Sequence, residues 1–132
     1  MRISTVTLAT GDQDRSCLFY ETFLGSPARR DGSGVIYFPL EGSWLALFPR
    51  GELARYCGVD GAGQGFEGVT LSVNLDSPEA VDAAAHRART AGATLVREPG
   101  PVSWGGYIAW IADPDGHLWE LVFNPKGGHE SP

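Results

Sequence analysis

The segment that decides the fold reads WGGYIAWIADPDGHLWELVF over residues 104–123. Apolar and aromatic residues dominate its two ends, and the stretch Asp-Pro-Asp-Gly at 113–116 is typical of a turn. The segment therefore predicts a strand over 106–112, a turn, and a last strand over 117–123, before Pro125 stops the pattern.

These strands end a longer series of predicted elements. Ser77 and Pro78 are typical of the first residues of a helix, and Gly92 is typical of its end. The remaining expectations for this half are a strand over 68–75, a short strand over 94–97 and a loop at 99–101. The first half gives the same order: a strand over 3–10, a helix from Asp12 to Gly25, and strands over 34–40 and 43–48.

Short sequence matches support a repeat. Residues 6–8 (Val-Thr-Leu) return at 69–71, and the glycines at 25 and 42 return at 92 and 116. We predict an α+β fold of two βαβββ modules in tandem, related by a pseudo-twofold axis, each a curved mixed sheet with one covering helix. The predicted boundaries are 1–50 for the first module, 51–66 for a glycine-rich linker with a short helical turn, 67–125 for the second module, and 126–132 for a polar tail.

Composition excludes several classes of protein. The 132 residues are 42% hydrophobic and 20% charged, which is ordinary for a folded globular chain. Ten Lys and Arg against sixteen Asp and Glu give a net charge of −6, which disfavours nucleic acid and anionic membranes as partners. No apolar run reaches the ~18 residues of a membrane span.

Two cysteines are too few for a disulfide framework. Cys17 lies in the first predicted helix, where a small core residue is expected, and Cys57 lies in the linker. A single long-range bridge stays open as an alternative, but a reducing cytoplasm is the simpler expectation.

The chain resembles the vicinal oxygen chelate superfamily, which comprises glyoxalase, bleomycin-resistance and extradiol dioxygenase proteins. The resemblance covers about residues 3–125 and is strongest at 104–107 and 113–121. Such a resemblance implies the fold, but the superfamily includes many chemistries and some proteins that only bind a ligand. Members with two modules per chain usually form homodimers, so the resemblance also implies a homodimer.

Metal enzymes of this superfamily hold a divalent ion with four side chains, two on first strands and two on last strands. Residue by residue, those positions fall here on Thr5, Ala46, Gly68 and Glu120, with Thr70 replacing Gly68 if the register slips by two. One carboxylate and weak hydroxyl ligands are too few donors for a divalent ion. We expect no tightly bound metal and no other cofactor.

The three histidines do not complete such a site. His86 falls on the second predicted helix, His117 in the turn before the last strand, and His129 in the tail. We expect none of them to bind a metal.

Glu120 lies in an apolar row with Leu118 and Val122, and a carboxylate there needs a partner. Three roles stay open. Glu120 is a structural residue satisfied by hydroxyls such as those of Thr5, Thr7 or Thr70, or it binds the polar or cationic part of a ligand, or it is a general acid or base.

Aromatic residues are the second feature of the predicted site, because flat rings stack on planar ligands and cations. Trp104 is the best ligand candidate, since it lies in a glycine-rich loop. The full set of candidate ligand-binding residues is Trp104, Gly105, Tyr107, Trp110, Glu120, Thr5, Thr70 and Trp44. The adjacent pair Arg29 and Arg30 is expected at a surface strand edge.

Three functions fit these residues. The first is a metal-free protein of the bleomycin-resistance kind, which binds a small aromatic or cationic ligand in an apolar groove. The second is a metal-free isomerase or lyase that uses Glu120. The third is a metal-dependent lyase or dioxygenase of the same superfamily.

Overall fold

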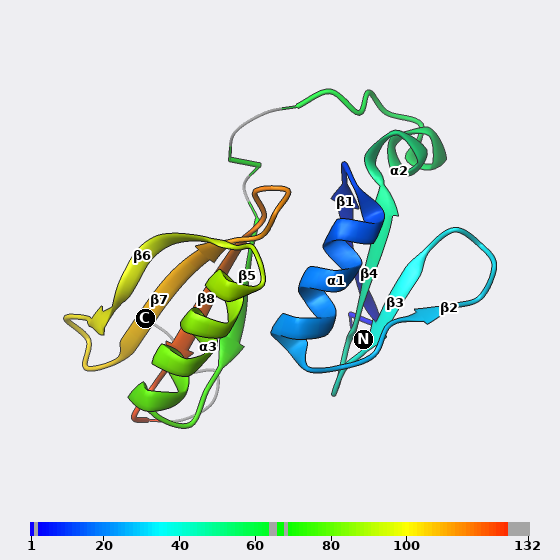
Figure 1. Ribbon diagram of the computed structural model, residues 1–132. Helices are drawn as coiled ribbons and strands as arrows, with labels where there is room; N and C mark the ends of the chain where they lie inside the picture. Colours follow the sequence, from blue (N-terminus) through cyan, green and yellow to red (C-terminus); the bar gives the residue numbers. More distant parts are fainter. Residues whose placement is uncertain (2, 64–65, 68, 127–132) are drawn as a thin grey trace. The chain divides into compact units, whose positions relative to one another are not determined.

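The computed structural model describes residues 1, 3–63, 66–67 and 69–126. It divides into two compact units, residues 1–67 and 68–132 (Figure 1). The first holds β1 (Thr5–Thr10), α1 (Gln13–Leu24), β2 (Arg29–Arg30), β3 (Ile36–Pro39), β4 (Trp44–Pro49) and α2 (Arg50–Cys57). The second holds β5 (Thr70–Asn74), α3 (Pro78–Thr90), β6 (Thr94–Pro101), β7 (Tyr107–Ala112) and β8 (Leu118–Phe123).

Each unit contains its own four-stranded sheet, and the two sheets have the same topology. The strand order is β1-β4-β3-β2 in one and β5-β8-β7-β6 in the other. In each, the first strand pairs in parallel with the last strand, and the remaining pairs are antiparallel. The predicted α+β fold of two βαβββ modules is therefore confirmed.

Local signals fix the first module's helix as predicted. The side chain of Asp12 accepts a hydrogen bond of 3.1 Å from the backbone of Arg15, and Gly25 ends α1 with φ of 65°. Aromatic residues of α1 are buried against the sheet, with the rings of Tyr20 and Phe38 centred 6.0 Å apart. Cys17 is buried in this helix, as expected for a small core residue.

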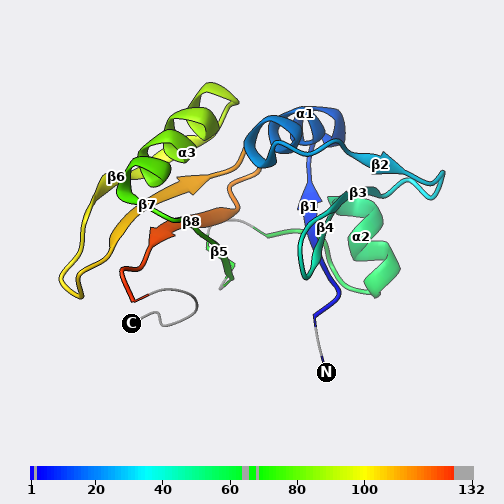
Figure 2. The same ribbon diagram turned by 90° about the horizontal axis from the view of Figure 1, so that it is seen from below.

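In the second module, α3 lies on one face of the sheet (Figure 2). Ser77 caps α3 through a 3.1 Å hydrogen bond from Ala80, and Pro78 is its first residue. The helix buries small residues such as Ala84 and Ala88, which let it lie close to buried sheet residues such as Ile111 and Leu121. The helix ends at Thr90, two residues before the end predicted at Gly92, and Ala91 is its C-cap.

Two predictions about secondary structure need correction. The loop expected at 99–101 is part of β6, which is an edge strand. Prolines fit there because an edge strand has backbone positions that donate no ladder hydrogen bond. We expected only a short helical turn in the linker, but the structure has an eight-residue helix there, α2. Arg29 and Arg30 form the exposed edge strand β2, in agreement with the expectation.

Both cysteines are free, Cys17 in the core and Cys57 on the surface. The alternative of a single bridge is therefore absent from this structure. No helix in the described part of the chain has the length and apolar character needed to cross a membrane.

Candidate ligand-binding site

Cross-strand pairing separates the second sheet into two faces. The hydroxyl of Tyr107 donates a 2.7 Å hydrogen bond to Asp82 of α3, so Tyr107 lies on the face that α3 covers. Leu95 is also on this face, because it lines a groove together with α3, and it pairs with Ile111. We call the opposite side of the sheet, which α3 does not cover, the open face, although Ile108 and Val122 on it are buried. By alternation along β7 and β8, the open face carries Trp110 and Glu120.

Glu120 has two close neighbours on the open face. It pairs with Ser72 on β5 and with Trp110 on β7. The hydroxyl of Ser72 donates a 3.1 Å hydrogen bond to the Glu120 carboxylate. Glu120 and Trp110 are half-buried, whereas Ser72 is exposed.

Ser72 is the residue that sequence reasoning missed. The expected hydroxyl neighbours were Thr5, Thr7 and Thr70, but Thr70 pairs with Leu118, two residues along the strand from Glu120. Thr70 still lies on the same face as Glu120 because it is two residues from Ser72. The alternation of Thr70 and Ser72 was visible in the sequence, but the register that selects Ser72 was not.

The donor set does not fit a protein-held divalent ion. Thr5 supplies a hydroxyl, Ala46 supplies no donor and is fully buried, and Gly68 lies outside the described residues. Glu120 supplies one carboxylate, and a divalent ion needs several donors from the protein. Among the described residues, no three His, Cys, Asp or Glu side chains lie close enough to hold a metal ion together.

Two of the histidines are placed by the structure. His86 is exposed on α3, and His117 lies in the turn before β8, where its backbone donates a 2.8 Å hydrogen bond to Asp113. His86 also lines the groove between α3 and β6, on the face that α3 covers. His129 lies outside the described residues.

Trp104 is held in the tight turn between β6 and β7. The backbone of Val102 donates to Gly106, and that of Gly105 donates to Val102, each at 3.0 Å. Gly105 has φ of 98°, which favours glycine. The indole lies directly over Gly106, where a Cβ atom would be 2.1 Å from the ring. The Trp104 ring therefore occupies the space that is free because Gly106 has no side chain.

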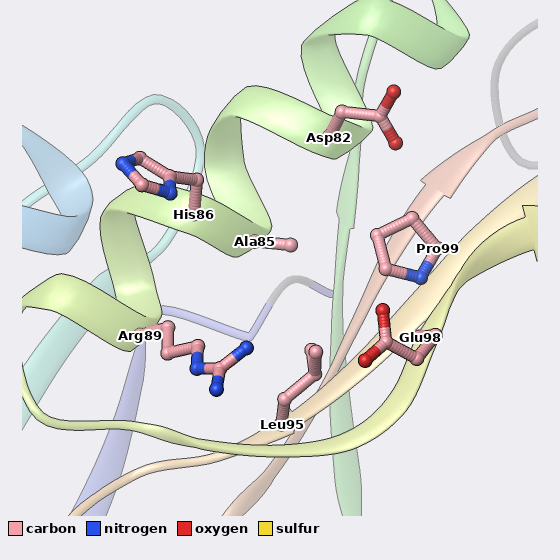
Figure 3. A pocket seen from close by; sticks show the side chains of 7 residues that line it. All are labelled: Asp82, Ala85, His86, Arg89, Leu95, Glu98 and Pro99. Atoms are coloured by element: carbon pink, nitrogen blue, oxygen red, sulfur yellow. The ribbon is translucent and has the colours of Figure 1, made fainter.

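Tyr107 lies apart from the other candidates of this module, on the face covered by α3. Its hydrogen bond to Asp82 raises the pKa of the phenol above the ordinary value of 10.0. Beside it, a groove of about 320 Å³ runs between α3 and β6 (Figure 3). The groove carries charges of both signs, including those of Asp82, Glu98 and Arg89.

The first module holds the remaining candidates. Thr5 pairs with Trp44, whose ring is centred 6.0 Å from that of Tyr37 in an edge-to-face arrangement. Trp44 is 39% exposed, which is high for an indole. Pairing places Ala46 between Thr7 and Tyr37, on the side of this sheet away from the aromatic core under α1.

The open face of the second module thus places a carboxylate and an aromatic ring on neighbouring strands. Such a pair binds a cation by charge and by the ring's negative face. The same carboxylate can also exchange a proton with a ligand held against the ring.

Comparisons with known proteins agree with the fold. The model of the Glyoxalase/Bleomycin resistance protein/Dioxygenase superfamily matches residues 2–121. The chain is 31% identical to a lactoylglutathione lyase of Haemophilus influenzae, over 94% of this chain and 93% of that protein. It is 32% identical to a lactoylglutathione lyase of Salmonella typhimurium, over 92% of each.

Among solved structures, a glyoxalase-related enzyme from Fulvimarina pelagi superposes with a TM-score of 0.84. It is 30% identical in sequence, and the match covers 95% of this chain and 89% of that one.

Proposed function

The chain belongs to the glyoxalase/bleomycin resistance protein/dioxygenase superfamily, and from this premise we propose that it binds a small aromatic or cationic molecule without a metal. The observation that carries the proposal is the pairing of Glu120 with Trp110 on the open face. A carboxylate beside an indole favours a ligand that is both cationic and flat.

The residue types at the superfamily's metal positions support the metal-free part of the proposal. Ala46 has no donor atom, and Thr5 offers a neutral hydroxyl. The Glu120 carboxylate already accepts a hydrogen bond from Ser72, which partly satisfies it without a metal ion.

Binding of benzylamine, a small aromatic cation, tests the proposal by titration calorimetry and by quenching of tryptophan fluorescence. Glu120→Gln keeps the side chain's size and removes its charge, so we expect the Kd to rise about tenfold or more. Glu98→Gln, on the face covered by α3, is the matched control and leaves the Kd unchanged. Equal Kd values for the wild type and Glu120→Gln would contradict the proposal.

Metal analysis tests the second part. The protein, purified without chelator, is expected to carry much less than one divalent ion per chain. A stoichiometric ion that is lost in Glu120→Gln would show that Glu120 is a metal ligand.

A metal-free lyase or isomerase is the second candidate, and the names of the relatives favour it. In this function Glu120 moves a proton on the bound substrate. Formation of lactoylglutathione is the assay, because the relatives are named for that compound. Turnover in the presence of chelator that Glu120→Gln abolishes would favour the enzyme over the binding protein. Turnover that appears only with an added divalent ion would favour the metal-dependent lyase.

We propose further that the protein is a cytoplasmic homodimer. The two free cysteines suit a reducing compartment. Light scattering of the purified protein tests the dimer, and a mass of a single 14.1 kDa chain would contradict it.

A further inference from the structure

A β-bulge on β6 changes which side chains reach the open face. Leu95 pairs with Ile111, but Arg97 pairs with Trp110, so Val96 is an extra residue in the ladder. Leu95 and Glu98 both line the groove beside α3, although strict alternation would put them on opposite faces (Figure 3). The bulge therefore places Arg97 on the same face as Trp110.

As a result, four side chains form a straight row across the second sheet. Ser72, Glu120, Trp110 and Arg97 are successive partners on β5, β8, β7 and β6. We call them the cross-strand row. Because neighbouring strands lie ~4.8 Å apart, the backbones of Glu120 and Arg97 are ~10 Å apart, with the indole between them.

Glu120 and Arg97, the two charged residues of the row, do not form an ion pair with each other. Glu120 accepts a hydrogen bond from Ser72 and has no cationic partner among the described residues. The side chain of Arg97 is exposed and makes no ion pair or hydrogen bond within the part of the chain that the structure describes. Both charges are thus available to a ligand that lies along the row.

The first module repeats the row without its carboxylate. Thr7, Ala46, Tyr37 and Arg29 are successive partners on β1, β4, β3 and β2. The hydroxyl, the aromatic ring and the arginine follow in the same order in both rows. Ala46 occupies the position in the first row that corresponds to Glu120 in the second. Only the second row therefore presents both a negative and a positive charge.

We infer that the cross-strand row binds a small zwitterion, with its cationic group on Glu120, its flat or apolar middle on Trp110 and its carboxylate on Arg97. The inference rests on the proposed function and narrows its ligand class. Arginine suits the last role because its planar guanidinium donates two parallel hydrogen bonds to a carboxylate.

Three matched compounds test the inference by calorimetry. They are 4-methylbenzylamine, 4-methylphenylacetate and the zwitterion 4-(aminomethyl)phenylacetate, which has both charged groups at opposite ends of one ring. We expect the zwitterion to bind about tenfold more tightly than either singly charged compound. Arg97→Gln should raise the zwitterion's Kd to that of the amine and leave the amine's Kd unchanged. Arg97→Lys should retain part of the gain, because it keeps the charge.

Arg89→Gln, in the groove beside α3, is the control and should change none of the three Kd values. A zwitterion that binds no better than the amine, or a Kd that Arg97→Gln does not change, would overturn the inference. If either result is found, but the amine still binds and Glu120→Gln still weakens its binding, the proposed function is kept and only this inference fails. If none of the three compounds binds to the folded wild type, both the proposed function and this inference fail.

Discussion

Ser72 donates a 3.1 Å hydrogen bond to the carboxylate of Glu120 across the parallel pair of β5 and β8. The bond gives a half-buried carboxylate a fixed partner and leaves its other acceptor positions for a ligand. On its other side, Glu120 pairs with Trp110 of the neighbouring strand β7.

We expect Ser72→Ala to lower the free energy of unfolding by about 0.5–1 kcal/mol, because the lost hydrogen bond lies near the surface. Urea denaturation measures this. Ser103→Ala is the control, since Ser103 is exposed and makes no such bond to a described residue. The Kd of benzylamine should also rise in Ser72→Ala, as Glu120 loses its orientation. A variant that keeps both wild-type values would show that the bond has no role in positioning Glu120.

Gly106→Ala should destabilise the second module. Its new methyl group would overlap the outer atoms of the Trp104 ring, so the ring would have to move out of its place over Gly106. We expect a loss of about 1–3 kcal/mol, measured by urea denaturation. Gly100→Ala is the control, because nothing lies within 4 Å of a Cβ there. The double variant Gly106→Ala, Trp104→Ala should recover part of the loss, and a Gly106→Ala variant as stable as Gly100→Ala would contradict the packing.

The free energy of unfolding should fall as the pH rises above about 9. Burial, with a smaller contribution from Glu21, raises the pKa of the Cys17 thiol above its ordinary value of 9.0. The unfolded thiol therefore loses its proton first, and the unfolded state gains stability as the pH rises. Urea denaturation at several pH values between about 8 and 10 should show a smaller fall in Cys17→Ala than in the wild type. Cys57→Ala, at an exposed site, should keep the wild-type slope.

Arg50 should protect the segment that follows α2 from proteolysis. Its Nε donates a 2.6 Å hydrogen bond to the carbonyl of Gly61, and its guanidinium forms a 3.0 Å ion pair with Glu67. We expect Arg50→Gln to speed chymotrypsin cleavage after Phe66, which is exposed, and mass spectrometry of the fragments measures the rate. Arg55→Gln removes an ion pair with Glu52 within α2 and is the control. Equal cleavage rates in the wild type and Arg50→Gln would show that these contacts do not restrain the segment.

The sequence by itself determined the order of the main elements of each module and the starts of α1 and α3. Asp12 and Ser77 cap their helices through backbone groups three residues away, and glycine and proline mark the ends of elements over similarly short distances. Because these interactions are local, residue type and spacing are enough to predict them. The repeat and the resemblance then led to the two-module fold and to Glu120.

Only the tertiary structure decided which residues surround Glu120. The choice of Ser72 over Thr70 depends on the register between β5 and β8, and Arg97 reaches the open face only because β6 carries a bulge. Register and bulges are set by packing between residues far apart in the chain, so no local pattern specifies them.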